Sequence, residues 1–535
     1  MCNKEDPWPT VVGALQSPSG VVMSQSAVQE ADRKNVRSML LRQAIVTPMT
    51  LGKGLFLLPF LAPNELLLWR LVQTWFGYAT RASFGTFSAL AFYLPKTQAA
   101  GDDDGGRAYH SVASYAALLG SLIAVGVGLA LSAVSVGWKL ALPLALWGAT
   151  LLPRAYVGAV LQARGSFQKL AVLDTLQAVL TFVLPVGGVV WFGFSGLVVG
   201  QACGLVLVFV RQSPLPFLRE AQPVVWAKAR SILRDGFQLW LNGSLKSLAS
   251  SLDINLVAFL IVSPTFGGQY AVALILCGFV ASVAQSAYRV LHRRIVQDLA
   301  QLDDTVTSDE AVEPPAVETV FGRIVRFTVL DVLVLTVAGG FLLALLPVVP
   351  WLFPKYAGAL PLVPLLLLGA GLTRARTYAE VPLKARQRFF ALHASFLFQL
   401  AVTAVFFVVL AADGPSPWLA ACQAVGAAPA TLGLWLIVRR DLRGNIASLL
   451  RLAVVLSMST LWLCTVDVSA VVVERSGSLL DVTVHLGAYA AQLAHIALGG
   501  LLVVLSVALL FPGSIRESVG LVVPGRLLAR IPGFR

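Results

Sequence analysis

The feature that most constrains the fold of this chain is a repeated run of about twenty mainly apolar residues, the length that a helix needs to cross a bilayer. Helices pair their backbone polar groups internally, as a lipid environment demands. Fourteen such runs cover residues 37–61, 65–95, 109–134, 139–163, 167–192, 195–211, 235–262, 267–292, 321–350, 358–378, 388–411, 416–438, 448–472 and 484–511. The pattern predicts an all-α, polytopic membrane protein with about fourteen transmembrane helices.

The composition of the chain excludes several other classes of protein. Only 13% of the 535 residues are charged and 57% are hydrophobic, whereas soluble domains average about 25% charged residues. A soluble enzyme and an ordinary nucleic-acid-binding domain are therefore excluded. The net charge of +13 has a simpler source, because cytoplasmic loops of membrane proteins are enriched in Lys and Arg.

The distribution of the basic residues predicts the topology. With the N-terminus on the cytoplasmic side, 31 of the 40 Lys and Arg residues fall in cytoplasmic segments and three fall in outer segments. One helix more or fewer would invert every later loop and destroy this asymmetry. We therefore expect a multi-pass protein with both termini in the cytoplasm.

The chain divides into two similar halves and an extension. Pro63 and Trp69 in the first half align, at one offset, with Pro264 and Tyr270 in the second. Two six-helix lobes of this kind are typical of secondary transporters, which hold a substrate between the lobes. The expected parts are a cytoplasmic tail at 1–36, an N-lobe at 37–234, a C-lobe at 235–440, two further helices at 441–515 and a basic cytoplasmic tail at 516–535. Met23 opens a stretch that resembles a natural start, which leaves open whether residues 1–22 belong to the native protein.

Basic side chains inside the spans mark a candidate substrate site, because each costs about 2.5–3.5 kcal/mol to insert at a helix centre. They are Arg42, Lys53, Arg70, Arg81, Arg154 and Lys246. Arg42 and Lys53 share one helix face, as do Arg70 and Arg81, because eleven residues make about three turns. The set predicts a cationic cavity between the lobes, suited to a phosphate or pyrophosphate anion. For Arg42 and Arg70, which lie near helix ends, snorkelling or internal pairing is the favoured alternative.

Acidic side chains inside the spans are candidate counter-ions or ion-coupling groups. Asp253 follows Lys246 by two helical turns, and we expect it to be the counter-ion of that lysine rather than a proton carrier. Asp174 is a second candidate of this kind. Asp174 and Asp331 are both expected near the cytoplasmic face, at the membrane interface.

No motif for a metal, cofactor or nucleotide is present in the sequence. The five cysteines are scattered, without the spacing of a metal site or a disulfide framework. The glycine-rich loop that binds ATP phosphates is missing, so ATP is not the expected energy source. The acidic run Asp102–Asp104 is expected to be an exposed polar loop rather than the metal site of a glycosyltransferase.

Four stretches of the chain resemble a known family. They are ASFGTFSALAFYLPKTQAAGDDDGGRAY at 82–109, GAVLQARGSFQKLAVLDTLQAVLTFVLPVGG at 158–188, GGQYAVALILCGFVASVAQSAYRVL at 267–291 and YAGALPLVPLLLLGAGLTRARTYAEVPLKARQRFFAL at 356–392. Together they resemble bacterial polysaccharide flippases of the multidrug/oligosaccharidyl-lipid/polysaccharide (MOP) superfamily, in particular O-antigen flippases. The similarity extends over about residues 37–440.

This resemblance implies a transporter, not an enzyme, in the bacterial inner membrane. Its expected cargo is an undecaprenyl-pyrophosphate-linked oligosaccharide for O-antigen, exopolysaccharide or capsule export. The expected mechanism is alternating access, with the glycan in the cavity and the polyprenyl tail in the membrane lipid. A monomer that cooperates with polysaccharide polymerase or assembly proteins, and needs no cofactor, is also implied.

Other functions remain as alternatives. A lipid II flippase has the same need for basic residues at the membrane midplane. A multidrug exporter of the MATE type has a similar fold, but cationic drugs favour a more acidic cavity. A polysaccharide polymerase or ligase usually carries a large outer loop, and the longest outer loop here, about 473–483, is short.

Overall fold

The computed structural model is built from helices over the residues that it describes. These are residues 25–99, 102–212, 223, 226–261, 263–282, 315–346, 352–386, 388–442, 444–465 and 479–511. The longer helices in this part are α1 (Gln25–Leu57), α2 (Pro63–Ala79), α3 (Thr86–Ala99), α4 (Asp103–Leu131), α5 (Ala141–Ala163), α6 (Phe167–Gln212), α8 (Trp226–Leu260), the helix Pro264–Ser282, α10 (Pro315–Leu345), α12 (Leu362–Ala385), α13 (Phe389–Ala411), α14 (Cys422–Asp441), α15 (Ile446–Thr465) and α16 (Leu479–Leu510). Short helical turns join them at η2 (Thr80–Ser83), η3 (Ser132–Val136), η4 (Trp138–Leu140), η5 (Pro354–Ala359) and η6 (Pro417–Ala421).

The predicted spans and the observed helices agree. Each of the fourteen predicted spans falls at least partly on one of these helical segments. In the part of the chain that the structure describes, eight helical stretches are long and apolar enough to cross a membrane. The chain is therefore an all-α, polytopic membrane protein, as predicted. The predicted tail at 516–535 and the question about residues 1–22 lie outside the described residues.

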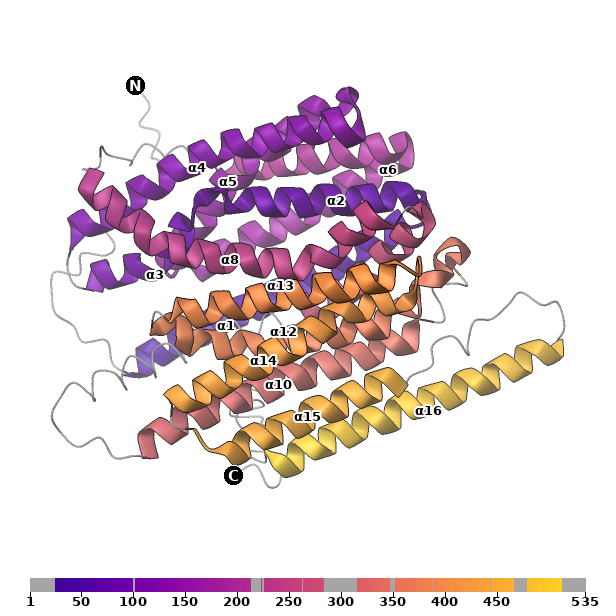
Figure 1. Ribbon diagram of the computed structural model, residues 1–535. Coiled ribbons are helices and arrows are strands. Elements are labelled where there is room, and N and C mark those ends of the chain that lie inside the picture. The colour runs from indigo at the N-terminus through magenta and orange to yellow at the C-terminus, as the bar shows by residue number, and fades with distance from the viewer. Residues whose placement is uncertain are drawn as a thin grey trace.

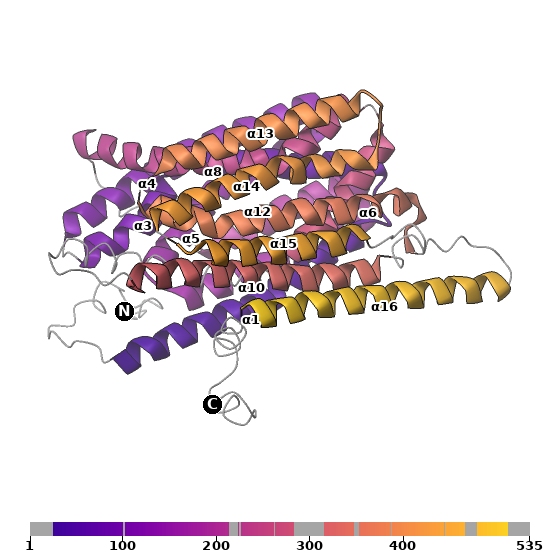
Figure 2. The same ribbon diagram turned by 60° about the horizontal axis from the view of Figure 1, so that its bottom comes forward.

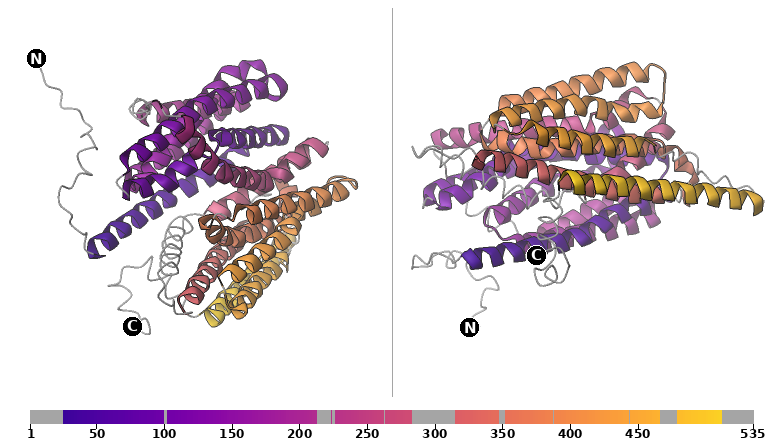
Figure 3. Two further views of the ribbon diagram at one scale, coloured as in Figure 1. Left: turned by 60° about the vertical axis from the view of Figure 1, so that its left-hand side comes forward. Right: turned by 90° about the horizontal axis from the view of Figure 1, so that it is seen from below.

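The helices form two groups with α8 near their boundary. Figure 1 shows α2 to α6 on one side and α10, α12, α14, α15 and α16 on the other. Helix α8 packs against α3 of the first group and against α13 of the second. Helices α15 and α16 pack on α10, at the outer edge of the second group (Figures 2 and 3). We refer to the two groups below as the first and the second lobe.

The internal repeat has a structural counterpart at the start of two helices. Pro63 begins α2, and Pro264 begins the helix Pro264–Ser282. Proline suits the first turn of a helix because its missing N–H would have no partner there. Trp69 and Tyr270, the other matched pair, are both buried in the apolar core.

The short turn predicted between residues 192 and 195 is present within α6. Gly193 leaves the helical conformation, with φ 58° and ψ −143°, and the chain turns back on itself. A side chain at Gly188 would collide with the carbonyl oxygen of Gly196, and one at Gly200 would collide with that of Leu184. The two arms are therefore antiparallel, and these glycines allow their backbones to touch.

A matched pair of substitutions tests this close packing. We expect Gly188→Ala to destabilise the protein by about 1–3 kcal/mol, because the new methyl group overpacks the contact with Gly196. Gly187→Ala is the control, since no atom lies within 4 Å of a Cβ built at that position. In a helix, that control change is neutral or stabilises by up to about 1 kcal/mol. The measurement is the thermal unfolding of each purified variant in detergent; equal midpoints for the two variants would contradict the hairpin packing.

One predicted span, residues 65–95, is broken. Helix α2 ends at Ala79 and α3 begins at Thr86, with Phe84 at φ 47° and Gly85 at φ 77° between them. A side chain at Gly85 would collide with the carbonyl oxygen of Gly236 in α8. The left-handed conformation and the close approach both require glycine. The break thus lets α8 pack closely on the start of α3.

Several helices are longer than predicted, and one acidic run has a structural role. Helix α1 begins at Gln25, inside the predicted tail 1–36, and α12 continues to Ala385. At the start of α4, Asp102 accepts a hydrogen bond of 2.8 Å from the backbone N–H of Gly105. The run Asp102–Asp104 is therefore an N-terminal cap, where negative charge is favoured by the helix dipole.

Candidate functional site

Arg42 and Arg154 share one carboxylate in the first lobe. Arg42 of α1 lies 2.7 Å from Asp174, and Arg154 of α5 lies 3.0 Å from the other oxygen of the same side chain. All three side chains are largely buried. Asp174 therefore pairs with two of the predicted site residues. The cluster keeps one positive charge in excess.

Lys53 of α1 contacts polar and aromatic groups inside the first lobe. Its ammonium group donates to the amide oxygen of Gln201 in α6. It also lies 5.1 Å from the centre of the Trp69 ring in α2, within the range of a cation–π interaction. Neither partner carries a negative charge, so the charge of Lys53 is not neutralised by them.

Arg81 lies at the boundary between the two helix groups. Its guanidinium donates to the hydroxyl of Ser247 in α8, at 2.7 and 3.1 Å. In return, the indole N–H of Trp240 donates to the backbone carbonyl of Arg81 at 2.7 Å. The break after α2 places this carbonyl and this side chain against α8. Arg81 is exposed, which leaves part of its guanidinium open to a further anion.

Lys246 of α8 pairs with Glu380 of α12, not with Asp253. The ammonium nitrogen lies 3.1 and 3.2 Å from the two carboxylate oxygens. The predicted Lys246–Asp253 pair is wrong, because seven residues along a helix span about 10 Å and the two side chains reach different neighbours. Asp253 instead accepts a hydrogen bond of 2.7 Å from the hydroxyl of Tyr270.

Glu380 pairs with two further cations that are not among the predicted site residues. Lys384 lies 2.8 Å and Arg376 lies 3.7 Å from its carboxylate oxygens. Arg376 also donates to the amide oxygen of Gln399 at 2.6 Å and stacks on the ring of Phe396. The signal was available, since the spacing Arg376, Glu380, Lys384 is i, i+4, i+8 on one helix face. We call Lys246, Arg376, Lys384 and Glu380 the basic cluster.

Arg70 of α2 is placed near the buried Asp253. Its guanidinium reaches Gln73 at 3.4 Å, and its charge acts electrostatically on the carboxylate of Asp253. Asp253 has no exposed surface. The positive charge of Arg70 therefore compensates the charge of Asp253. Internal pairing of this kind is the alternative that the position of Arg70 near a helix end favours.

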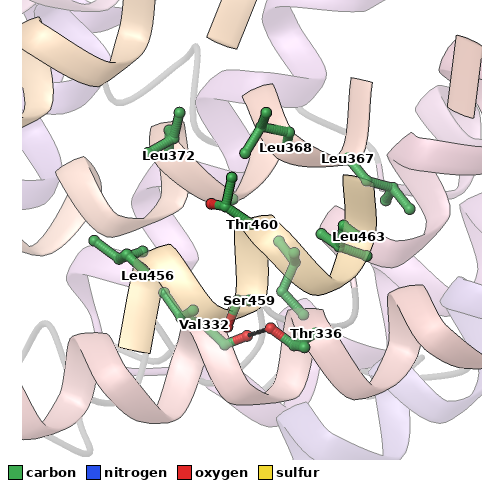
Figure 4. A pocket seen from close by; sticks show the side chains of 11 residues that line it. Val332, Thr336, Leu367, Leu368, Leu372, Leu456, Ser459, Thr460 and Leu463 are labelled. Atoms are coloured by element: carbon green, nitrogen blue, oxygen red, sulfur yellow. Dashed lines mark hydrogen bonds between the residues drawn. The ribbon is translucent and has the colours of Figure 1, made fainter. Parts of the chain in front are cut away.

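The pocket in Figure 4 is not the predicted cavity between the lobes. It lies between α10, α12 and α15, with Val332, Gly371 and Ser459 among its lining residues. Its free volume is about 10 Å³, which is room for no more than one water molecule. Within the described residues, no three His, Cys, Asp or Glu side chains come together that could hold a metal ion.

The geometry as a whole brings basic groups from both lobes to α8. Arg81 contacts Ser247, and the neighbouring residue Lys246 belongs to the basic cluster. Lys53, Arg42 and Arg154 are held separately, inside the first lobe. The six predicted cations thus do not form one site. Two of them are found at α8: Lys246 belongs to this helix, and Arg81 bonds to it.

Comparison with known proteins identifies the fold. No protein-family model matches the chain, and no curated protein matches its sequence. An outward-facing multidrug resistance MATE family transporter of the MOP superfamily is similar in structure, with a TM-score of 0.55 and 16% identity over 77% of this chain and 96% of that one. A MOP superfamily transporter from Pyrococcus furiosus, described by the reverse polarity of its binding pocket, has a TM-score of 0.52 and 15% identity over 77% and 96%.

A third solved structure is similar over more of the chain. The lipid II flippase MurJ, in an inward closed conformation, has a TM-score of 0.53 and 12% identity over 85% of this chain and 97% of that one. At these identities the comparisons show the fold alone. The chain has the fold of MOP superfamily transporters and is a multi-pass membrane protein.

Proposed function

We propose that this chain is a secondary transporter that flips a diphosphate-linked oligosaccharide lipid across the bacterial inner membrane. The cargo class is an undecaprenyl-pyrophosphate-linked glycan for O-antigen, exopolysaccharide or capsule export. The transporter works by alternating access, as a monomer with both termini in the cytoplasm, and it is not an enzyme. Polysaccharide polymerase or assembly proteins receive the glycan on the outer side.

The observation that carries this proposal is the excess of positive charge in the basic cluster. Three cations face the single carboxylate of Glu380. Arg376 has no exposed surface, whereas the side chains of Lys246 and Lys384 are 33% and 24% exposed. The two lysines can therefore contact a substrate while Arg376 supports the carboxylate that orients them. A pyrophosphate carries the multiple negative charge that such a cluster attracts.

The position of the cluster supports the same function. Lys246 is next in sequence to Ser247, which holds Arg81 from the other lobe. A diphosphate at this level of α8 can contact cations of both lobes. The hydrogen bond between Arg81 and Ser247 must break when the lobes move apart. An anion that binds Arg81 in place of Ser247 therefore couples substrate binding to the movement of the lobes.

A lipid II flippase is the second candidate. Its cargo carries the same diphosphate, and the similarity to the lipid II flippase structure covers 85% of this chain, compared with 77% for the MATE family transporter. Both candidates use the basic cluster in the same way. A multidrug exporter for cations is less favoured, because the basic cluster repels a cationic substrate.

The test of this proposal is the sidedness of the lipid-linked glycan pool in cells that lack the protein. We expect the glycan-loaded carrier to accumulate on the cytoplasmic leaflet, and the wild-type protein, but not the Lys246→Met variant, to restore export. Accumulation of lipid II instead selects the second candidate. A normal pool together with greater sensitivity to cationic drugs would overturn the proposal.

A further inference from the structure

Asp331 of α10 is a buried carboxylic acid that the substrate site does not use. The sequence places it near the membrane interface, but only 1% of the residue is exposed. Within the described part of the chain, neither of its carboxylate oxygens has a hydrogen-bond partner. An ionised carboxylate in that state is costly, so burial favours the protonated form unless a cation approaches.

The cation at the same level is Arg374 of α12. Helices α10 and α12 run in opposite directions and touch where Leu335 meets Gly371. Asp331 is one turn before Leu335, and Arg374 is one turn after Gly371, so both lie on the same side of this contact. The charge of Arg374 acts electrostatically on Asp331, although no hydrogen bond joins them.

Arg374 currently bonds to a third helix. Its guanidinium donates a hydrogen bond of 2.6 Å to the backbone carbonyl of Ala281, in the last described turn of the helix Pro264–Ser282. It is also close enough to Lys246 for the two positive charges to interact. Arg374 is therefore drawn toward any negative charge that appears at Asp331.

The other helices around Asp331 present no competing charge at its level in the residues that the structure describes. Leu452 and Val455 of α15 and Val507 of α16 belong to the same apolar cluster as Val329 and Val332, the neighbours of Asp331. Arg374 of α12 is the charged group that faces the carboxyl. A change of protonation at Asp331 thus acts on Arg374 first.

A small pocket lies close in sequence to this position. The pocket in Figure 4 begins beside Asp331, at Val332. Thr336, Ser459 and Thr460 are among its mainly apolar lining residues, and the hydroxyl of Ser459 has no partner in the described part of the chain. Its volume fits one water molecule.

The helix that Arg374 holds belongs to the boundary between the lobes. The amide of Gln43 in α1 donates a hydrogen bond of 2.9 Å to the carbonyl of Ser282, next to Ala281. Further along, Gly54 of α1 packs against Ile275. Loss of the hydrogen bond from Arg374 to Ala281 therefore loosens the helix Pro264–Ser282 at the end that bonds to α1.

We propose that Asp331 is a proton-binding site whose charge state controls the bond between Arg374 and the helix Pro264–Ser282. With the proton on a carboxylate oxygen, Asp331 is neutral and Arg374 donates to Ala281. When a water molecule takes the proton, the carboxylate attracts the guanidinium and the bond to Ala281 breaks. This inference holds whatever the transported substrate is.

Hydrogen exchange of the full-length protein in lipid nanodiscs tests this inference. Exchange rates are first corrected for the intrinsic effect of pH. We then expect the backbone amides of residues 275–282 in the wild-type protein to exchange about tenfold faster or more when the pH is raised. A change of this size corresponds to the loss of one charge-assisted hydrogen bond. Asp331→Asn should keep the low-pH exchange rate at every pH. Asp441→Asn, which changes an acid paired with the exposed Arg388, is the matched control and should titrate like the wild type.

The outcomes distinguish a failure of this inference from a failure of the proposed function. An exchange profile that is the same in wild type and Asp331→Asn would overturn the inference, whether or not the protein flips a glycan. If Asp331→Asn does not fold, infrared difference spectroscopy of the wild-type protein decides. The spectrum of a protonated carboxylic acid without a hydrogen bond, which disappears as the pH rises, supports the proton-binding site. The absence of such a titrating signal contradicts it.

Discussion

Replacing Glu380 with glutamine lowers the stability of the protein by about 3–5 kcal/mol, the cost of breaking a buried ion pair by removing one partner. Glu380 is fully buried and forms ion pairs with Lys246, Arg376 and Lys384. The glutamine keeps the shape of the side chain and removes only the charge. The three cations then repel one another, and Arg376 remains buried without a counter-ion. The measurement is thermal or denaturant unfolding of the purified protein in detergent.

Glu65→Gln is the matched control for this prediction. Glu65 caps α2 by accepting a hydrogen bond of 2.8 Å from the backbone N–H of Ala62, a role that glutamine fills equally well. We expect a loss below about 1 kcal/mol for this variant. Equal losses for the two substitutions would mean that Glu380 does not organise the basic cluster.

Arg81→Gln is expected to lower transport more than tenfold while leaving the protein folded. Its guanidinium is exposed and bonds to the neutral hydroxyl of Ser247, so its removal leaves no carboxylate unpaired there. A charge-assisted hydrogen bond to an anion contributes about 1.5–3 kcal/mol, which corresponds to more than tenfold in binding. The rate of glycan flipping in vesicles is the readout.

Arg107→Gln serves as the control for Arg81, since it makes the same change at an exposed position in the first turns of α4. It should leave the flipping rate unchanged. A variant Arg81→Lys that restores part of the rate would support a direct charge contact. Unchanged transport in Arg81→Gln would remove Arg81 from the substrate site.

Much of the fold could be predicted from the sequence because lipid imposes a simple rule on length and polarity. The hairpin inside α6 was predictable, since glycines and a serine interrupt two apolar runs at residues 193–196. The break at residues 80–85 was not predicted, although Thr80, Arg81, Ser83 and Gly85 interrupt the apolar pattern there. Its cause is a distant contact, the approach of Gly85 to Gly236 in α8, and a local pattern does not contain that information.

The site was predicted less completely, for a reason that follows from charge pairing. Counting charges within the spans found Lys246, which belongs to the basic cluster, and Arg81, which bonds to the next residue of α8. It missed Arg376, Glu380 and Lys384, because a dense run of charges at the end of an apolar stretch resembles a loop. Ion pairing with Glu380 allows these residues to stay within the helix, and the i, i+4 spacing was the available signal.

The central claim is that the basic cluster on α8 and α12 handles an anionic, diphosphate-linked glycan. The most direct test is to reconstitute the purified protein in vesicles and measure flipping of a fluorescent polyprenyl-diphosphate oligosaccharide alongside uptake of a cationic dye. The account predicts glycan flipping that depends on Lys246 and is inhibited by free pyrophosphate, without dye transport. Dye transport with no glycan flipping, unaffected by Lys246→Met, would contradict it.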